Sequence, residues 1–133
     1  MSQNIQRGLY ALLTNEPTMS ALIGNRVWAI SLPENPVRPT LRYGIVAWTG
    51  DPTFDTSGLQ RARVQFDCFG DTADDAMSLR WALLAFLNGY SGTLVDGTVL
   101  QWAEHIQSID FFESGPRQYR CMAEFYLTFN LNL

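Results

Sequence analysis

The chain contains no lysine, and all nine of its basic residues are arginine. Arginine is enriched at protein interfaces and lysine is depleted there, because the planar guanidinium is weakly hydrated and pairs bidentately. A coding bias of the source genome would give the same composition. The net charge of −4 argues against independent DNA binding, which normally needs a basic patch that neutralises phosphates.

Metal-binding residues are also scarce. His105 is the only histidine, and Cys68 and Cys121 are the only cysteines. Two cysteines and one histidine without a close-spaced pair do not match the spacing of a zinc site. Both cysteines fall on the inward faces of expected strands, so we expect two buried free thiols and no metal.

Catalytic motifs are missing as well. The sequence has no glycine-rich phosphate loop, no serine elbow and no metal-binding helix motif. Asp51 and Asp55 lack the spacing and the central glycine of a calcium loop. Acids scattered along strands, such as Glu104 beside His105, are more often solvent-facing than catalytic. We therefore expect no enzyme, no catalytic residue and no cofactor.

Long apolar runs are absent, since the longest one, Trp81–Leu87, is far too short to cross a bilayer. The first four residues lack the charged and apolar regions of a signal peptide. The 133 residues, 47% hydrophobic and 17% charged, are typical of one globular domain. We expect a single domain over residues 1–133 that is made and used in the cytoplasm and does not contact a membrane.

The first third of the chain predicts two helices and two strands. Apolar residues at helical spacing predict a helix over Asn4–Thr14, and Pro17 suits the first turn of a second helix that ends near Ile23. A short strand over Val27–Ile30 precedes an extended, exposed, proline-rich loop. The next strand, Leu41–Thr49, is expected to place Ala47 on the inward face and Trp48 on the other. The polar connection after it carries Phe54 near its tip, where an aromatic side chain either tucks back or contacts a partner.

The centre of the chain reads Arg61-Ala62-Arg63-Val64-Gln65-Phe66-Asp67-Cys68-Phe69-Gly70. Alternation places the even-numbered side chains in a core and the charged, odd-numbered ones on the opposite face. A helix over Thr72–Leu87 follows, capped by Asp71 or Thr72. Its end, from Trp81 onward, is apolar on every side, so we expect it to be covered by the sheet and by either the amino-terminal helix or a neighbouring subunit.

Two strands close the sequence. Asp96-Gly97 predicts a tight turn, and the strand from Thr98 to about Phe112 lacks clean alternation, which predicts a bulge or a break near Ala103–Gln107. The last strand, Tyr119–Leu131, would be about 44 Å long if fully extended, against a diameter of roughly 36 Å for a compact chain of this size. It must curl or project, and a projecting strand would offer a sheet edge for assembly.

The order and spacing of these features resemble the phage tail completion family, also described as tail-to-head joining or tail terminator proteins. The features that carry the resemblance are the helix before Gly24-Asn25-Arg26-Val27-Trp28, the proline-bearing loop, the strand near Leu41–Trp48, the central strand and helix, and the closing strand. The resemblance implies an α+β domain with a mostly antiparallel sheet packed against helices. It also implies a non-enzymatic virion protein that forms a ring, usually a hexamer, at the head-proximal end of the tail.

Such a ring would terminate the tail tube and meet a head completion or connector protein, while DNA only passes through the lumen. The protein would then reside in the virion, at the head–tail junction. The family has no catalytic motif to transfer, so the interface residues are a guess from position: Arg61, Arg63, Asp67, Phe54, Trp48 and Tyr126. The alternative function is a small-ligand-binding α+β domain with a pocket between sheet and helices.

Overall fold

A computed structural model describes residues 4–50 and 58–130 of the chain. These residues form three helices and six strands: α1 (Ile5–Asn15), α2 (Pro17–Ile23), β1 (Val27–Ala29), β2 (Thr40–Gly50), β3 (Leu59–Gly70), α3 (Ala73–Leu87), β4 (Gly92–Thr93), β5 (Val99–Glu113) and β6 (Gln118–Asn130). The expected helices and strands are confirmed, with bounds that shift by a few residues.

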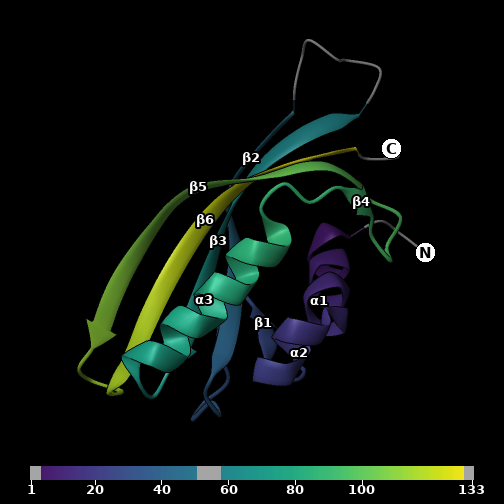
Figure 1. The fold of residues 1–133 in the computed structure, drawn as a ribbon. Coiled ribbons are helices and arrows are strands. Elements are labelled where there is room, and N and C mark those ends of the chain that lie inside the picture. Colours follow the sequence, from purple (N-terminus) through teal and green to yellow (C-terminus); the bar gives the residue numbers. More distant parts are fainter. Residues whose placement is uncertain (1–3, 51–57, 131–133) are drawn as a thin grey trace.

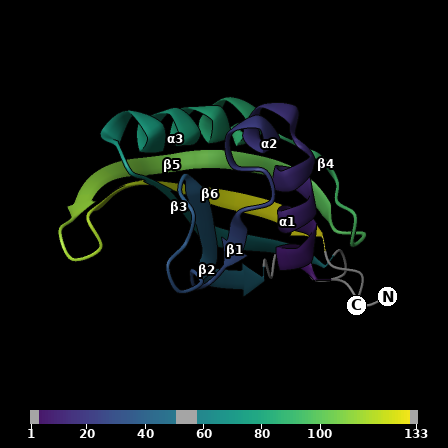
Figure 2. The ribbon, with the colours of Figure 1, turned by 90° about the horizontal axis from the view of Figure 1, so that it is seen from below.

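The strands form one sheet in the order β1-β2-β3-β6-β5-β4. The β1–β2 pairing is parallel and the other four pairings are antiparallel. The three described helices all lie on one side of the sheet, and the sheet bends so that its other face is concave (Figures 1 and 2). The predicted α+β class with a mostly antiparallel sheet is confirmed, and the sheet has the shape of a half-barrel.

Alternating side chains of β3 and β6 build the core beneath the helices. Val64, Phe66 and Phe125 are fully buried, and the Phe66 and Phe125 rings meet edge-to-face with centroids 5.5 Å apart. Aromatic pairs in this geometry stabilise a core beyond the area that they bury. The inward face predicted for the central strand is therefore the core face of the sheet.

Side-chain caps start the helices where the sequence signals them. The Asn4 side chain accepts hydrogen bonds from the first turn of α1, Glu16 accepts one from Met19 N at 2.7 Å, and Thr72 Oγ1 accepts one from Asp75 N at 3.1 Å. Each cap satisfies a backbone N–H that the helix leaves without a partner. A Cβ at Gly70 would lie 2.7 Å from Ala76 N, so only glycine fits the close approach of strand β3 to helix α3.

A bulge in β2 corrects one sequence prediction. Ile45 pairs with Val64, but Ala47 pairs with Arg63 and Trp48 with Ala62, which leaves Val46 as an extra residue. Because one inserted residue reverses the facing of everything beyond it, Trp48 lies on the core face and Ala47 on the concave face. The expected placement of these two side chains was wrong for this reason.

For the last strand the sequence left open whether it curls or projects as a sheet edge, and the projecting alternative is wrong. β6 pairs with β3 on one side and with β5 on the other, so it is central and offers no edge. The β5–β6 hairpin curves beyond the first turn of α3 (Figure 1). β5 has register shifts between Leu100 and Trp102 and between His105 and Gln107, the second inside the predicted window.

The two cysteines face each other across the middle of the sheet. Cys68 pairs with Cys121, both are buried, and both are free thiols. Burial raises the pKa of each thiol, and for Cys121 the nearby Arg80 guanidinium partly opposes that rise.

Helix α3 buries only part of its apolar end. Ala82, Leu83 and Leu87 are buried, whereas Trp81 is 74% exposed. The sheet and α2 pack on this helix and leave one apolar stripe uncovered in the single chain. No helix within the described ranges is both long and apolar enough to span a bilayer.

Candidate assembly surface

Among the described residues, no helix covers the concave side of the sheet (Figure 2), and the strand register places most of the charged side chains of the long strands on this side. We call it the open face. Its polar and aromatic members, assigned from the strand register, include Arg42, Arg61, Arg63, Gln65, Asp67, Trp102, Glu104, Gln107, Phe111, Glu113, Arg120, Glu124 and Tyr126.

Asp67 lies at the centre of an ion-pair cluster on this face. One carboxylate oxygen, Oδ2, accepts a hydrogen bond from Arg42 Nη2 at 2.9 Å, and Oδ1 accepts one from Arg120 Nη1 at 2.9 Å. Gln65 Nε2 lies 3.2 Å from both oxygens. The Asp67 side chain is only 4% exposed, so two guanidiniums from β2 and β6 neutralise a buried charge within one subunit.

Glu124 forms the second charged pair. Its carboxylate lies 2.9 Å from Arg63 Nη2 and accepts a hydrogen bond from Gln107 Nε2 at 3.0 Å. The hydrogen bond and the negative charge of Glu124 raise the pKa of Arg63, which keeps the guanidinium charged. Arg63 therefore holds a buried carboxylate of its own subunit, which explains why a cation stands at this position.

Arg61 differs from its neighbours because no carboxylate pairs with it among the described residues. Its guanidinium lies over the Tyr126 ring, 3.9 Å from the centroid, and the side chain is exposed. A stacked guanidinium keeps its donors free along its edge while losing little further entropy on binding. Arg61 and Tyr126 thus form a pre-ordered cationic patch on the open face.

The structure brings four of the six candidate interface residues together: Arg61, Arg63, Asp67 and Tyr126 share the open face. Trp48 lies on the opposite face, where its ring meets Phe129 edge-to-face at 5.3 Å and its Nε1 donates to Gln60 Oε1 at 2.9 Å. Phe54 lies outside the described residues.

Sequence reasoning missed the partners that neutralise this face, namely Arg42, Arg120 and Glu124. Alternation placed all three on outward faces, but it could not tell which strands are neighbours. Strand order was the missing information.

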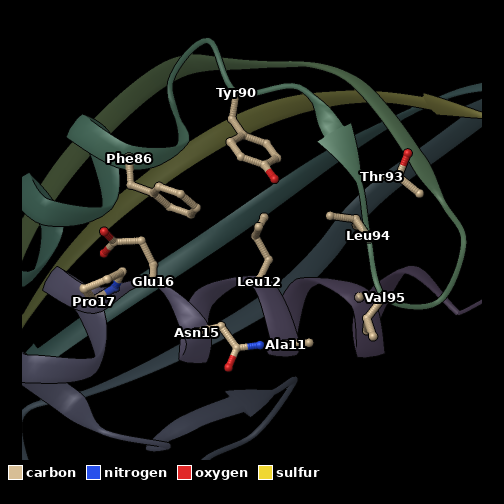
Figure 3. A pocket seen from close by; sticks show the side chains of 11 residues that line it. Ala11, Leu12, Asn15, Glu16, Pro17, Phe86, Tyr90, Thr93, Leu94 and Val95 are labelled. Atoms are coloured by element: carbon tan, nitrogen blue, oxygen red, sulfur yellow. The ribbon is translucent and has the colours of Figure 1, made fainter.

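Two open depressions lie on the helical side of the molecule. The first, of about 420 Å³, lies between α1 and residues 90–95. Figure 3 shows Phe86, Tyr90, Leu12 and Leu94 around it, with the Glu16 carboxylate beside Phe86. The second, of about 520 Å³, lies between α2 and α3 beside Trp81, and it shares Glu16 and Phe86 with the first. One oxygen of Glu16 already caps α2, so neither depression holds a fully free charge from that residue.

The ionisable residues form no ligand set within residues 4–50 and 58–130, where no group of three or more histidine, cysteine or acidic side chains could hold a metal ion. His105 Nε2 lies 2.8 Å from Ser108 Oγ, and its ring contacts Phe125 at a centroid distance of 5.5 Å. These contacts describe a structural histidine on β5.

Comparison with known proteins agrees with the fold. The family model described as "Tail completion protein gp17" matches residues 7–128. A chain in the solved structure "Virion of native gene transfer agent (GTA) particle" is 16% identical, with a TM-score of 0.71, over 93% of this chain and 92% of that one. No curated protein matches this sequence. At this identity the solved structure shows a shared fold, and the family match confirms the resemblance read from the sequence.

Proposed function

Because the chain belongs to the tail completion protein gp17 family, we propose that it forms a ring at the head-proximal end of a phage or prophage tail. The ring terminates the tail tube and joins it to the head. The observation that carries this proposal is the family match over residues 7–128, which spans nearly all of the described fold. A chain of a gene transfer agent virion with the same fold supports a structural role in a virion.

Size supports six copies in the ring. A compact chain of this length has a diameter of roughly 36 Å, and six touching spheres of that size leave a central hole of about the same width. Three such spheres leave a hole of only about 6 Å, by the same size relation. A hexamer is therefore wide enough to pass duplex DNA even when its subunits interlock.

The partners of this ring are the tail tube protein on one side and a head completion or connector protein on the other. DNA passes through the lumen without being held. The pairing of Arg42, Arg63 and Arg120 with carboxylates supports this, since a guanidinium already paired adds little to phosphate binding. The protein would then be made in the host cytoplasm and reside at the head–tail junction of the virion.

The candidate interface residues divide into two roles. Arg61 and Tyr126 contact a neighbouring subunit or a tail partner directly, because the exposed Arg61 guanidinium stacks on the Tyr126 ring and has no carboxylate partner among the described residues. Arg63 and Asp67 act as positioning residues that hold the strands of this face in place. Trp48, which is 44% exposed near the end of β2, contributes apolar contact, and so does Phe54, which follows β2 in the sequence.

The test is the mass of the purified protein in solution, together with negative-stain imaging of the protein alone and after mixing with tail tubes. We expect ring-shaped particles of about six subunit masses, either free or at one end of the tubes. A protein that stays monomeric at high concentration and also fails to bind tubes would contradict the proposal.

A small-ligand-binding function remains the second candidate, and the depression lined by Phe86 and Tyr90 favours it. Those two rings contact each other, with centroids 5.3 Å apart, and together form an apolar wall of the depression. A thermal-shift screen with small ligands separates the two functions, because a true ligand gives a saturable rise in Tm. Reproducible saturation that is lost in Phe86→Ala would favour this candidate over the ring.

A further inference from the structure

Two strand edges of the sheet lack a neighbour over stretches of equal length. On β5, the neighbouring segment ends where Gly89 N donates to Ala103 O and Asn88 Oδ1 accepts from His105 N. On β2, β1 pairs only as far as Tyr43. Among the described residues, no strand lies beside residues 107–113 of β5 or residues 44–50 of β2. We call these seven-residue stretches the open β5 edge and the open β2 edge; each is about 24 Å long.

Both edges lack two of the residues that protect natural edge strands. Natural edge strands are protected by lysine and other charged residues, by proline, by β-bulges or by being very short. The charges on the open β5 edge, Asp110 and Glu113, are already paired with Arg80 and Arg120 of the same chain. The two open edges contain no lysine and no proline. Instead, Ile109, Phe111 and Phe112 are 38–50% exposed on one, and Val46 and Trp48 are 44–53% exposed on the other. Pairing with another strand would cover these exposed apolar side chains and satisfy the backbone groups of both edges.

The backbone alternation shows which residues face outward on β5. In an antiparallel strand, the N–H and C=O of one residue point to one neighbour and those of the next residue point to the other. Ala103 uses both groups on the side away from β6, since its N–H donates to Tyr90 O and its C=O accepts from Gly89 N. The bulge at Ile106 shifts the alternation by one residue. The backbone N–H and C=O groups of Ser108, Asp110 and Phe112 therefore point away from β6.

The same reasoning applies to β2. Leu41 N donates to Arg26 O and Tyr43 O accepts from Ile30 N, so these residues point away from β3. Beyond them, the bulge at Val46 shifts the alternation by one residue. The backbone N–H and C=O groups of Ile45, Trp48 and Gly50 therefore point away from β3. Each open edge therefore presents three residues with outward backbone groups.

We propose that the open β5 edge of one copy pairs antiparallel with the open β2 edge of the next copy in the ring. One register pairs every outward residue: Ser108 opposite Gly50, Asp110 opposite Trp48, and Phe112 opposite Ile45. β2 and β5 are separated by three antiparallel pairings, so they run in opposite directions and the added pairing continues the sheet. The five side chains of these six residues lie on the core face, Gly50 having none, so the helices of both copies stay on one side.

The blocked ends of the two edges define the extent of this pairing. β1 stops a neighbouring strand at Tyr43, and the Asn88–Tyr90 segment stops one at His105. The interface joins two different surfaces of each subunit, which is the arrangement that closes a ring by rotation. This inference rests on the proposed ring, and it specifies how neighbouring copies are joined.

The first experiment compares Ser108→Pro with Ser108→Ala. Both variants remove the hydroxyl that contacts His105, but only proline removes the outward N–H. We expect the alanine variant to assemble like wild type, and the proline variant to stay at subunit mass at concentrations where wild type forms rings, with unchanged far-UV circular dichroism. Rings formed by a folded Ser108→Pro variant would overturn the edge pairing while leaving the ring itself intact.

A second measurement decides the matter if Ser108→Pro fails to fold. Ser108→Cys combined with Gly50→Cys places thiols opposite each other across the proposed junction, whereas Ser108→Cys with Thr49→Cys places them on opposite faces of the sheet. On oxidation we expect intermolecular disulfide ladders from the first pair, and from neither the second pair nor wild type. Equal ladders from both pairs, or none from the first in a ring of normal mass, would contradict the pairing. Absence of any ring from wild type, with or without tails, would instead contradict the proposed function.

Discussion

The Arg63 guanidinium lies 2.9 Å from the Glu124 carboxylate, and the two side chains differ sharply in exposure, 40% for Arg63 and 3% for Glu124. Removing the Arg63 side chain leaves the buried Glu124 carboxylate without its cation. Among the described side chains, Gln107 then remains as its hydrogen-bond donor. Charge reversal at this position would disturb folding as well as assembly. Arg63 is therefore a poor site for testing assembly alone.

We predict that Arg63→Met lowers Tm, and that Arg63→Met combined with Glu124→Met recovers part of the loss, because the double variant leaves no unpaired buried charge. Thermal unfolding of the two single variants and the double variant gives the coupling. A double variant whose loss equals the sum of the single losses would show that the two residues do not act as a pair.

Asp67 should be among the most sensitive carboxylates in the chain. Asp67→Asn removes the charge that two guanidiniums share in a nearly buried site, and such a loss costs about 3 kcal/mol in the free energy of unfolding. Asp71→Asn is the matched control, since Asp71 pairs with Arg38 but is 62% exposed. The control should cost less than about 1 kcal/mol. Urea unfolding measures both, and equal losses would argue against the special status of Asp67.

Tyr43 should make stability fall at high pH. Burial, with a smaller contribution from Tyr10, raises the pKa of Tyr43 to about 12, whereas in the unfolded chain the pKa lies near 10. Between those values the folded state retains a proton that the unfolded state has lost, so the free energy of unfolding decreases as the pH rises from 10 to 12.

Tyr43→Phe tests this dependence. The variant loses the hydrogen bond from Tyr43 Oη to Gln6 O, so it should be less stable than wild type at neutral pH. Its stability should also decline less steeply between pH 10 and 12, with the buried thiols contributing the remaining slope. Urea unfolding at pH 9, 10 and 11 provides the comparison, and parallel declines in the two proteins would count against the assignment.

Arg61 is the better position for testing the open face as an interface. Its side chain is exposed and stacks on Tyr126 without a carboxylate partner among the described residues, so Arg61→Glu should change Tm little. We predict that it weakens ring formation or tail binding at least tenfold. Arg7→Glu, on the exposed surface of α1, makes the same charge change elsewhere and should assemble normally. Native mass measurements on both variants test this prediction. Equal assembly of the two variants would show that Arg61 does not lie in the interface.

Local patterns in the sequence were enough to predict most of the elements. The alternation of the central strand placed Val64 and Phe66 in the core, and Thr72 was correctly identified as a possible cap of α3. These features depend on neighbours within a few residues, where side-chain period and capping chemistry act directly. The resemblance to the tail completion family added the class of the fold.

Features that depend on residues far apart in the chain could not be predicted from local sequence patterns. A bulge at Val46 leaves no local signal, yet it moved Trp48 to the opposite face. The partners of Asp67 come from β2 and β6, which lie 25 and 53 residues away in the chain, and alternation does not specify strand order. Pairing between strands depends on the packing of the whole sheet, so the ion pairs of the open face emerged only with the fold.

The central position of β6 also sets an order of events during synthesis. β3 and β5 share a sheet only through β6, so the ribosome has to add residues 118–130 before the two halves of the sheet can join. Until then the nascent chain exposes apolar strand edges on both sides of the gap, where premature pairing with another chain is possible. The sheet should therefore close only once β6 has left the ribosome, and the yield of the protein in cells should depend on chaperones that shield those edges.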